Sequence, residues 1–457
     1  MSAQRLVVSG LEPGPALGLA AGALVAALGR ERAVRPVTVG LDLPLWRLLY
    51  DGEGRPPRTL DPVIHPWSLA AELHDWWAED VDLTLFIAVE PALDRWQGIE
   101  GSRAVDLATR FDAPLLLVVD ARDRGPTAAA AVLGVRALAR RVEFAGVIVV
   151  GGDDRSSGGE LGALLREEAG SPLLGWIPPQ LSEQFAREQA APAGVRQLGP
   201  RPAGGSAQQL CREAATYIQV DEVVAAASRS GYLPGAERRT LIPAPVAAGL
   251  TLAVGWGPPL QPLALENIDA LQATGLTLAP LHLARDRGLP PGVSGLLLAG
   301  RLDEERVDAF AANTELHAAL AAALDEGLPT LAVGGGTLLL LRRLADSRGR
   351  SHELAGVLPA EGELLEWYER PRYLDCRAAP GNPFDEGEGK LLELFDLEFL
   401  VLERDAPAYE ILGEGETQGE GFSVGRCLAT TLLPSLPARP QLTQRFVEAM
   451  RAAGPRA

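Results

Sequence analysis

Short apolar runs alternate with longer stretches of helical periodicity through the first half of the chain. Such alternation predicts a parallel β-sheet covered by helices, the arrangement of a doubly wound α/β domain. The runs predicted as strands are rich in Leu or in β-branched residues and lie at residues 5–9, 37–41, 83–89, 115–120, 147–150 and 174–177.

A second alternating series begins at residue 251. The stretch before it, residues 179–245, is rich in Pro, Gly, Ala and Gln and predicts a linker that carries one helix, at residues 207–228. The second series predicts further strands and two helices, and after residue 354 it becomes strand-rich and acidic. These strands lie at residues 252–254, 276–281, 295–298 and 330–333, and the helices at 307–326 and 441–453. Since 457 residues exceed one ordinary domain, we predict two α/β domains, residues 1–230 and 231–457.

Charge and apolar content exclude several classes of partner. The formal net charge is -18 at pH 7, and no basic run offsets it. Because nucleic acids and anionic membranes are bound through clustered Lys and Arg, we expect no nucleic acid and no membrane among the partners. The apolar stretches are far shorter than the roughly 20 residues that cross a bilayer, and the first strand begins too early for a signal peptide. The sequence therefore predicts a cytoplasmic protein.

The cysteines do not form a recognisable framework. Cys211, Cys376 and Cys427 are few, odd in number and without metal-like spacing. This pattern argues against disulfides and against a zinc site. We predict that all three are packing residues and that the chain has no metal site.

A turn at residues 10–18 stands where a phosphate-binding loop would follow the first strand. In a working P-loop, backbone N–H groups cradle phosphates, a Lys neutralises their charge, and a Ser or Thr holds magnesium. This turn reads GLEPGPALG, so Leu17 stands at the Lys position and Gly18 at the hydroxyl position. Glu12 adds a negative charge, and the two prolines each remove an amide donor. By itself the segment is typical of an ordinary strand–turn–helix.

Several short motifs follow one another along the first domain in a specific order. They are VGLD at residues 39–42, TLD at 59–61, VE at 89–90, GSRAVDLA at 101–108, APLLLVVDA at 113–121, GVIV at 146–149 and LLGWIP at 173–178. Each motif is weak alone, but in this order they span essentially the whole domain. In this respect the chain resembles the cobyrinate a,c-diamide synthases.

The resemblance implies a dethiobiotin-synthetase-like P-loop fold for the first domain. Such a domain binds Mg-ATP and activates a tetrapyrrole carboxylate as an acyl phosphate. The cofactor-binding positions that carry over are Gly10, Gly14, Asp42 and Glu90, whereas the Lys and the Thr of the family do not. Asp42 and Glu90 are also typical of strand-end residues that cap neighbouring helices, and this alternative stays open.

A further set of motifs runs through the second domain. They are EN at residues 266–267, GVSGLLLAG at 292–300, AANTEL at 311–316, GLPTLA at 327–332, GVLP at 356–359 and GEGF at 419–422. They resemble the class I glutamine amidotransferase half of the same family. The resemblance implies an α/β domain in which a Cys in a strand-to-helix elbow attacks glutamine, a His exchanges the proton, and a Glu orients the His.

The predicted elbow contains no thiol. Gly334 stands at the Cys position, Val333 at the preceding acidic position, and Thr337 lies three residues too late to attack. His352 is the last His of the chain, so the segment at residues 429–433 cannot supply the base. We therefore predict no catalytic residue here and no glutaminase activity.

Three other features leave alternatives open. Glu398 resembles the remaining Glu of the site, but a lone Glu on an edge strand is normally solvated. The acidic and aromatic run at residues 361–375 is predicted as an exposed, variable insertion. A group of rings could line a flat macrocycle site or could form the core-facing side of a helix. These rings belong to His65, Trp67, His74, Trp76 and Trp77.

The sequence leads to one hypothesis and two alternatives. The hypothesis is a non-catalytic or regulatory relative of the family that binds a tetrapyrrole, an active paralogue, or a second copy as a homo-oligomer. The first alternative is a divergent ATP-dependent amidase of tetrapyrrole carboxylates that uses free ammonia. The second is a structural subunit of a cofactor or redox assembly. Function transfers only through residues that are present.

Overall fold

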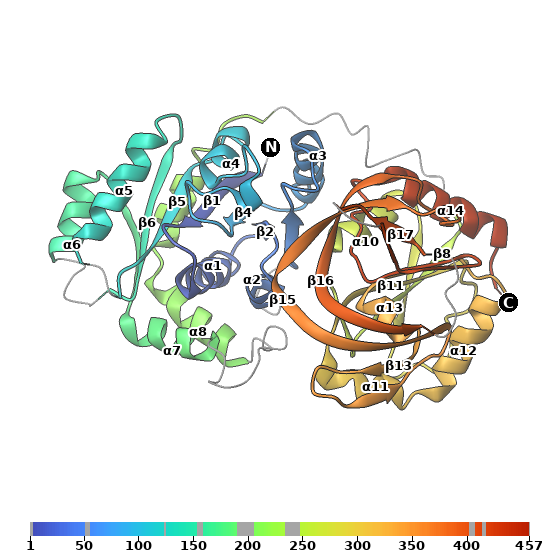
Figure 1. The fold of residues 1–457 in the computed structure, drawn as a ribbon. Helices are drawn as coiled ribbons and strands as arrows, with labels where there is room; N and C mark the ends of the chain where they lie inside the picture. The colour runs from blue at the N-terminus through green and yellow to red at the C-terminus, as the bar shows by residue number, and fades with distance from the viewer. Residues whose placement is uncertain are drawn as a thin grey trace. The chain divides into compact units, whose positions relative to one another are not determined.

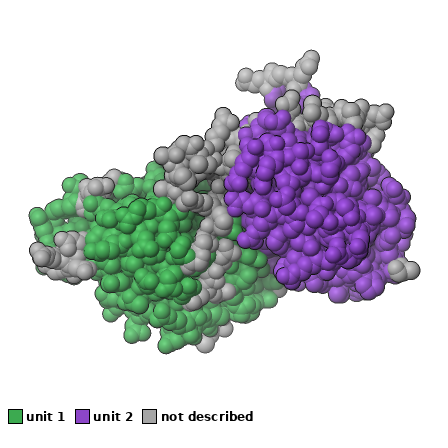
Figure 2. Space-filling model, turned by 90° about the horizontal axis from the view of Figure 1, so that it is seen from below, with its two compact units in different colours: residues 1–237 green, residues 238–457 purple. Residues whose placement is uncertain are grey.

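The computed structural model describes residues 3–50, 55–122, 125–152, 159–189, 205–233, 247–401, 407–413 and 417–456. Figure 2 shows the two compact units of the chain, residues 1–237 and 238–457. Each unit has its own sheets and its own buried core. Within the described residues, no helix combines the length and the apolar composition that a membrane span requires.

The described strands of the first unit form one sheet in the order β3-β2-β4-β1-β5-β6-β7 (Figure 1). They are β1 (Gln4–Gly10), β2 (Val34–Val39), β3 (Arg58–Leu60), β4 (Leu83–Ala88), β5 (Leu115–Asp120), β6 (Phe144–Val150) and β7 (Leu173–Ile177). All of its strand pairs are parallel. The chain enters the sheet at β1 and adds strands on both sides, which confirms the doubly wound fold class. Strand β3 is absent from the sequence prediction.

The strands read as near-continuous apolar runs because helices cover both faces of such a sheet. Leu115, Leu116 and Leu117 of β5, for example, are fully buried. The helices of this unit are α1 (Pro15–Leu28), α2 (Leu43–Tyr50), α3 (Trp67–Trp77), α4 (Ala104–Arg110), α5 (Thr127–Leu138), α6 (Glu160–Ala163), α7 (Pro179–Gln189), α8 (Gly205–Ala214) and α9 (Val220–Ala227). Short turns η1 (Trp96–Gly98), η3 (Leu164–Glu168) and η4 (Ala215–Tyr217) join them.

Helix α1 is apolar on almost every side because other helices enclose it. The Phe185 ring of α7 lies 3.6 Å from the point that a β-carbon on Gly18 would occupy. The Cys211 sulfur of α8 fills the space that a β-carbon on Gly22 would need. The prediction of a linker from residue 179 is therefore wrong over α7, and residues 190–204 and 234–246 lie outside the described part.

The second unit contains a sheet in the order β10-β8-β11-β12-β20-β19. Its strands are β8 (Thr251–Trp256), β10 (Thr277–His282), β11 (Gly295–Leu302), β12 (Thr330–Gly334), β19 (Phe422–Val424) and β20 (Cys427–Thr430), and β9 (Leu260–Gln261) pairs with β11. The first four strands and β20 are parallel, and β19 is antiparallel. The second domain is thus α/β, as predicted.

The second unit contains two helices, α11 and α12, where the sequence predicts one. Its helical elements are α10 (Leu265–Ala273), the turn η5 (Glu304–Arg306), α11 (Val307–Ala311), α12 (Thr314–Asp325), α13 (Gly335–Leu339) and α14 (Pro440–Ala453). The predicted helix at 307–326 is interrupted because Asn313 caps α12. Its side-chain oxygen accepts the Leu316 N–H, and its amide donates to the carbonyls of Leu283 and Asp286.

A second, mixed sheet has the order β14-β13-β15-β17-β18, with β16 paired to β15. Its strands are β13 (Leu341–Ala345), β14 (Ser351–Glu353), β15 (Leu358–Ala378), β16 (Glu388–Val401), β17 (Tyr409–Ile411) and β18 (Gln418–Glu420). The run at 361–375, predicted as an exposed insertion, instead lies within β15, between other strands. Its charged residues alternate with buried Gly362 and Leu364, the period of a strand.

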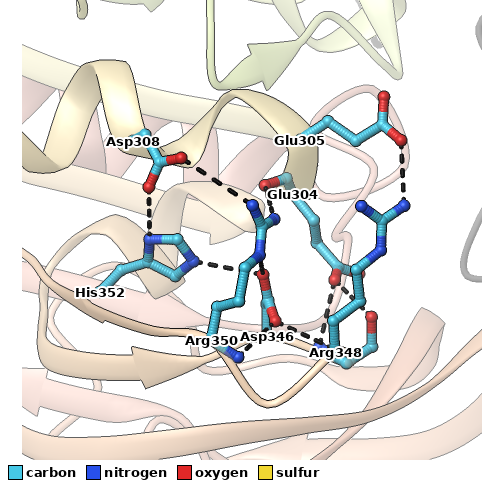
Figure 3. Close-up of polar contacts among 8 residues, drawn as sticks. Glu304, Glu305, Asp308, Asp346, Arg348, Arg350 and His352 are labelled. Carbon is cyan, nitrogen blue, oxygen red and sulfur yellow. Dashed lines mark hydrogen bonds and ion pairs between the residues drawn. The ribbon is translucent and has the colours of Figure 1, made fainter.

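A polar cluster fastens the β13–β14 turn to α11 (Figure 3). The Asp346 carboxylate accepts the backbone N–H groups of Arg348 at 3.0 Å and Arg350 at 2.9 Å. It also accepts Arg350 Nε at 2.7 Å. His352 Nε2 lies 3.2 Å from Asp346 Oδ2, and its Nδ1 lies 3.1 Å from Asp308 Oδ1 of α11. One buried carboxylate thereby organises the whole turn.

Candidate functional site

Three neighbouring strands of the first unit end at the same edge of the sheet. Ser9 of β1 and Val39 of β2 both lie beside Ala88 of β4 in the strand register. The segments that follow these strands meet at the carboxyl edge, where open α/β sheets bind ligands. The predicted cofactor-binding residues on these segments are Gly10, Gly14, Asp42 and Glu90.

Backbone contacts hold the turn between β1 and α1. The Gly10 carbonyl accepts the Ala92 N–H at 3.1 Å, and the Leu11 N–H donates to the Val118 carbonyl at 3.1 Å. The Glu12 carbonyl lies 2.6 Å from the point that a β-carbon on Gly10 would occupy. Only glycine fits at position 10 without moving the turn.

The start of α1 offers a phosphate only part of what a P-loop offers. Gly14 precedes the helix with φ 151°, a backbone conformation that favours glycine. Pro15 takes the first helical position and has no N–H to donate. Leu17, which the sequence comparison aligns with the lysine of a P-loop, is 6% exposed and packs into the unit. A phosphate at this turn would meet backbone amides but no lysine.

Asp42 and Glu90 stand at the ends of adjacent strands and make different contacts. Asp42 Oδ1 accepts the Leu45 N–H at 2.8 Å, and the Asp42 carbonyl accepts the Trp46 N–H at 2.8 Å. Asp42 therefore caps α2, which confirms the capping alternative for this residue. The Glu90 carbonyl accepts the Ser9 hydroxyl at 3.0 Å, which ties β4 to β1 at the edge.

The predicted aromatic group divides between core and surface. His74 and Trp77 of α3 are buried, and the His74 ring lies 5.4 Å from Phe86 and 5.2 Å from Phe111, centroid to centroid. Burial lowers the pKa of His74. Trp67 is partly exposed and lies under the Arg110 guanidinium at 4.5 Å. The core-facing interpretation is thus confirmed for His74 and Trp77.

His65 is also part of the core. Its Nδ1 accepts the Asp61 N–H at 3.0 Å, and burial lowers its pKa to about 4. The ring is therefore neutral at physiological pH, with its proton on Nε2. It supports the turn that follows β3.

The predicted elbow of the second unit has an elbow's backbone. Strand β12 ends at Gly334, which has φ 59° and ψ -128°, and α13 begins at the next residue. Strained strand-to-helix turns of this kind present the nucleophile in many hydrolases. Here the turn presents a residue without a side chain.

The space around Gly334 is already filled. A β-carbon there would lie 2.8 Å from the Gly300 carbonyl oxygen and 3.0 Å from Leu433 Cδ2. Leu433 follows β20 and is buried. At Gly335 and Gly336, backbone atoms of β11 occupy the space that a β-carbon would need. The three glycines together let α13 pack directly on β11.

Thr337, the hydroxyl residue that follows the elbow in the chain, is buried inside the fold. It is fully buried, and its hydroxyl lies 2.9 Å from the Ala332 carbonyl and 2.6 Å from the Thr430 carbonyl. These acceptors belong to β12 and β20. The hydroxyl therefore links the two strands.

Two charged residues near these strand ends are absent from the sequence prediction. Glu420 accepts the backbone N–H of Thr431 at 2.8 Å and the hydroxyls of Thr430 and Thr431, and burial raises its pKa. Arg301, buried at the end of β11, donates to Gln261 Oε1 at 3.1 Å. Glu420 lies within the GEGF motif, which could have identified it from the sequence. No motif of the sequence analysis contains Arg301.

The remaining predicted acid, Glu398, lies on β16 and pairs with Glu363 of β15 in the strand register. Strand β16 pairs with β15 alone among the named strands of the described chain. Among the described residues, no three His, Cys, Asp or Glu side chains gather where they could hold a metal ion.

Comparison with known proteins shows which family this chain resembles. A model of the CobB/CobQ-like glutamine amidotransferase domain matches residues 261–371, a range that contains the elbow. A cobyrinate a,c-diamide synthase of Dehalococcoides mccartyi is 24% identical over 98% of this chain and 98% of its own. One of Syntrophotalea carbinolica is 26% identical over 99% of each chain. A hydrogenobyrinate a,c-diamide synthase of Stutzerimonas stutzeri is 27% identical over 77% of this chain and 79% of its own. These matches confirm the resemblance predicted from the motifs.

Proposed function

Because the chain is a cobyrinate a,c-diamide synthase-like protein over nearly its whole length, we propose that it is a non-catalytic or regulatory partner in tetrapyrrole metabolism, of the cobalamin or sirohaem type. It would keep the two-domain scaffold and a binding surface for a macrocycle, an active paralogue or a second copy. The chemistry of the relatives would be carried out elsewhere.

The pair Gly334 and Leu433 is the observation that carries this proposal. Glutamine cleavage at an elbow needs a nucleophile and a base within hydrogen-bond reach of each other. At this elbow a residue without a side chain meets an aliphatic side chain. Neither can attack an amide or accept a proton. Removal of a nucleophile or a base alone typically costs several orders of magnitude in rate.

The first unit supports the same proposal through Leu17 and Pro15. A buried leucine supplies no charge to a phosphate, and a proline at the first helical position removes one donor from the helix end. The nearby Glu12 adds a negative charge to the turn. These three residues oppose the binding of a nucleoside triphosphate.

A second candidate is an ATP-dependent amidase that takes free ammonia. Asp42 and Glu90 favour it because they stand at the ends of adjacent strands beside the turn that begins at Gly10. Ammonia enters without an elbow nucleophile, so Gly334 does not oppose this candidate. It requires that magnesium-ATP bind to the first unit without the lysine.

Calorimetric titration with magnesium-ATP tests the proposal, followed by titration with a cobyrinate-like or sirohydrochlorin-like macrocycle. We expect no nucleotide binding at micromolar concentrations and, if the tetrapyrrole link holds, binding of the macrocycle. Micromolar binding of nucleotide would reject the non-catalytic assignment, and amidation with ammonia as the only nitrogen source would then establish the second candidate. If neither ligand binds, the proposed role in tetrapyrrole metabolism is rejected.

A further inference from the structure

The second unit exposes a tryptophan at the carboxyl edge of its parallel sheet. Trp256 is the last residue of β8 and is 49% exposed. The other tryptophans whose burial the structure describes are buried or half-buried. Because open α/β sheets bind ligands at the carboxyl ends of their strands, an exposed indole at this edge is well placed to contact a ligand.

A histidine holds the Trp256 ring in place. His282 ends the neighbouring strand β10 and lies beside Trp256 in the strand register. The two ring centroids are 5.0 Å apart and the ring planes meet at 76°, an edge-to-face contact. The His282 ring also lies against Gly257, where a β-carbon would be 2.9 Å from His282 Nε2. These contacts fix the indole while nearly half of Trp256 stays exposed.

The turn after β10 is closed on the ends of both strands. The Leu283 N–H donates to the Trp256 carbonyl at 3.2 Å, and the Arg285 N–H donates to the His282 carbonyl at 3.0 Å. The Asp286 carboxylate accepts the His282 backbone N–H at 2.7 Å and is thus engaged in the fold. The Arg285 side chain is exposed and makes no ion pair with the described residues. This edge therefore carries an exposed ring and a guanidinium.

A flat ring with an acidic substituent suits these two groups. An indole stacks on conjugated rings, and a guanidinium pairs with carboxylates. A small saturated ligand would leave most of the indole surface uncovered, and a cation would be repelled by Arg285. A tetrapyrrole with carboxylate side chains has both of the required features.

We propose that Trp256 stacks on the tetrapyrrole of the proposed function and that Arg285 pairs with one of its carboxylates. The inference rests on that function and assigns the macrocycle to the ends of β8 and β10. The elbow follows β12, and β11 lies between β8 and β12 in the sheet. A surface at β8 and β10 therefore does not depend on the replaced residues of the elbow.

Calorimetric titration of the full chain with cobyrinate tests this inference. Trp256→Ala should weaken binding about tenfold to a hundredfold, the usual loss when an aromatic side chain is removed from beneath a stacked ring. Trp256→Phe should retain part of the affinity, because the smaller ring still stacks. Arg285→Gln should weaken binding about threefold in dilute salt and less in concentrated salt, since an exposed ion pair is screened.

Matched controls remove the same kinds of group elsewhere. Tyr232→Ala removes an aromatic ring from a residue of the first unit that is 82% exposed. Arg426→Gln removes an exposed guanidinium next to β20. Cys427, the first residue of β20, pairs with the first residue of β12, so Arg426 lies at the opposite, amino end of the sheet. Both controls should bind cobyrinate as the native chain does.

The outcomes separate this inference from the function on which it rests. If the native chain binds cobyrinate and Trp256→Ala binds it equally well, the macrocycle lies elsewhere and only this inference is overturned. If the native chain does not bind cobyrinate, the proposed tetrapyrrole link fails and the inference fails with it. A circular dichroism melt of each variant separates lost binding from lost folding.

Discussion

The carbonyl oxygen of Leu298 occupies the space that a β-carbon on Gly336 would need. Because this oxygen belongs to β11 of the central sheet, it cannot move aside as a side-chain end could. Gly336→Ala should lower the free energy of unfolding by about 1–3 kcal/mol or more, the usual range for overpacking a core. Urea unfolding of the full chain measures the change.

A second glycine in the same unit serves as the control. A β-carbon on Gly288 would have only the Ala319 β-carbon near it, at 4.0 Å, so Gly288→Ala should change stability by less than about 0.5 kcal/mol. An equal effect of the two substitutions would mean that α13 does not pack on β11 as closely as described.

The half-buried Glu420 makes stability depend on pH. Burial raises its pKa, so the folded protein holds the proton more tightly than the unfolded chain. Its contribution to the free energy of unfolding is fully present at pH values below the ordinary pKa of glutamate. The contribution is lost as pH rises through the pKa that Glu420 has in the folded protein. Glu420→Gln should therefore gain stability relative to the native chain as pH rises from about 4 to 8. Urea unfolding across this range checks the difference, with exposed Glu388→Gln as control; parallel curves for Glu420→Gln and the native chain would contradict it.

Asp346 should give the opposite pH dependence. Burial alone would raise its pKa, but hydrogen bonds from the Arg350 backbone and from the His352 and Arg350 side chains outweigh burial and lower it. Its contribution to the free energy of unfolding is present at pH values above the ordinary pKa of aspartate. The contribution is lost as pH falls through the lower pKa that Asp346 has in the folded protein. Asp346→Ala should cost at least about 2 kcal/mol at pH 7, since several donors lose their acceptor. The cost should shrink toward pH 3.

Asp308 supplies the comparison for Asp346. Its side chain is 71% exposed although it contacts the same histidine, so Asp308→Ala should cost less than about 1 kcal/mol. Thermal melts of both variants at pH 7 and pH 3 measure the costs. If Asp308→Ala costs as much as Asp346→Ala, the buried carboxylate does not organise the turn.

The sequence predicts strands well where they read as long apolar runs. Strand β5 was predicted with its observed bounds because both faces are covered and all its positions but the last are buried. Strand β3 is absent from the prediction because it has only three residues, the first of them charged. Three residues are too few to show the alternation of apolar and polar positions that marks a strand. The start of the run at 361–375 resembles an exposed insertion because Glu361 and Glu363 alternate with the buried Gly362 and Leu364.

The candidate sites divide in the same way. Gly334 could be placed from sequence because an elbow follows directly from a strand and the glycines after it. Its contact with Leu433 could not be predicted, since the two residues are far apart in the chain and meet only through the pairing of β12 with β20.

The last prediction concerns the elbow itself. Restoring a thiol and an imidazole in the double variant Gly334→Cys/Leu433→His should not produce glutaminase activity. A β-carbon at 334 would lie 2.8 Å from the Gly300 carbonyl oxygen of β11, and this backbone atom cannot move aside as a side-chain end could. The backbone of β11 would therefore crowd the cysteine.

Release of glutamate from millimolar glutamine measures this, beside an unfolding curve that shows whether the double variant is folded. The single variant Leu433→His is the matched control, because it adds the base without the nucleophile. Glutamate release that exceeds this control and disappears after alkylation of the cysteine would show that the elbow is open to substrate. In that case only the two missing side chains would prevent glutamine cleavage. If the folded double variant releases no glutamate, the surrounding backbone also excludes the reaction.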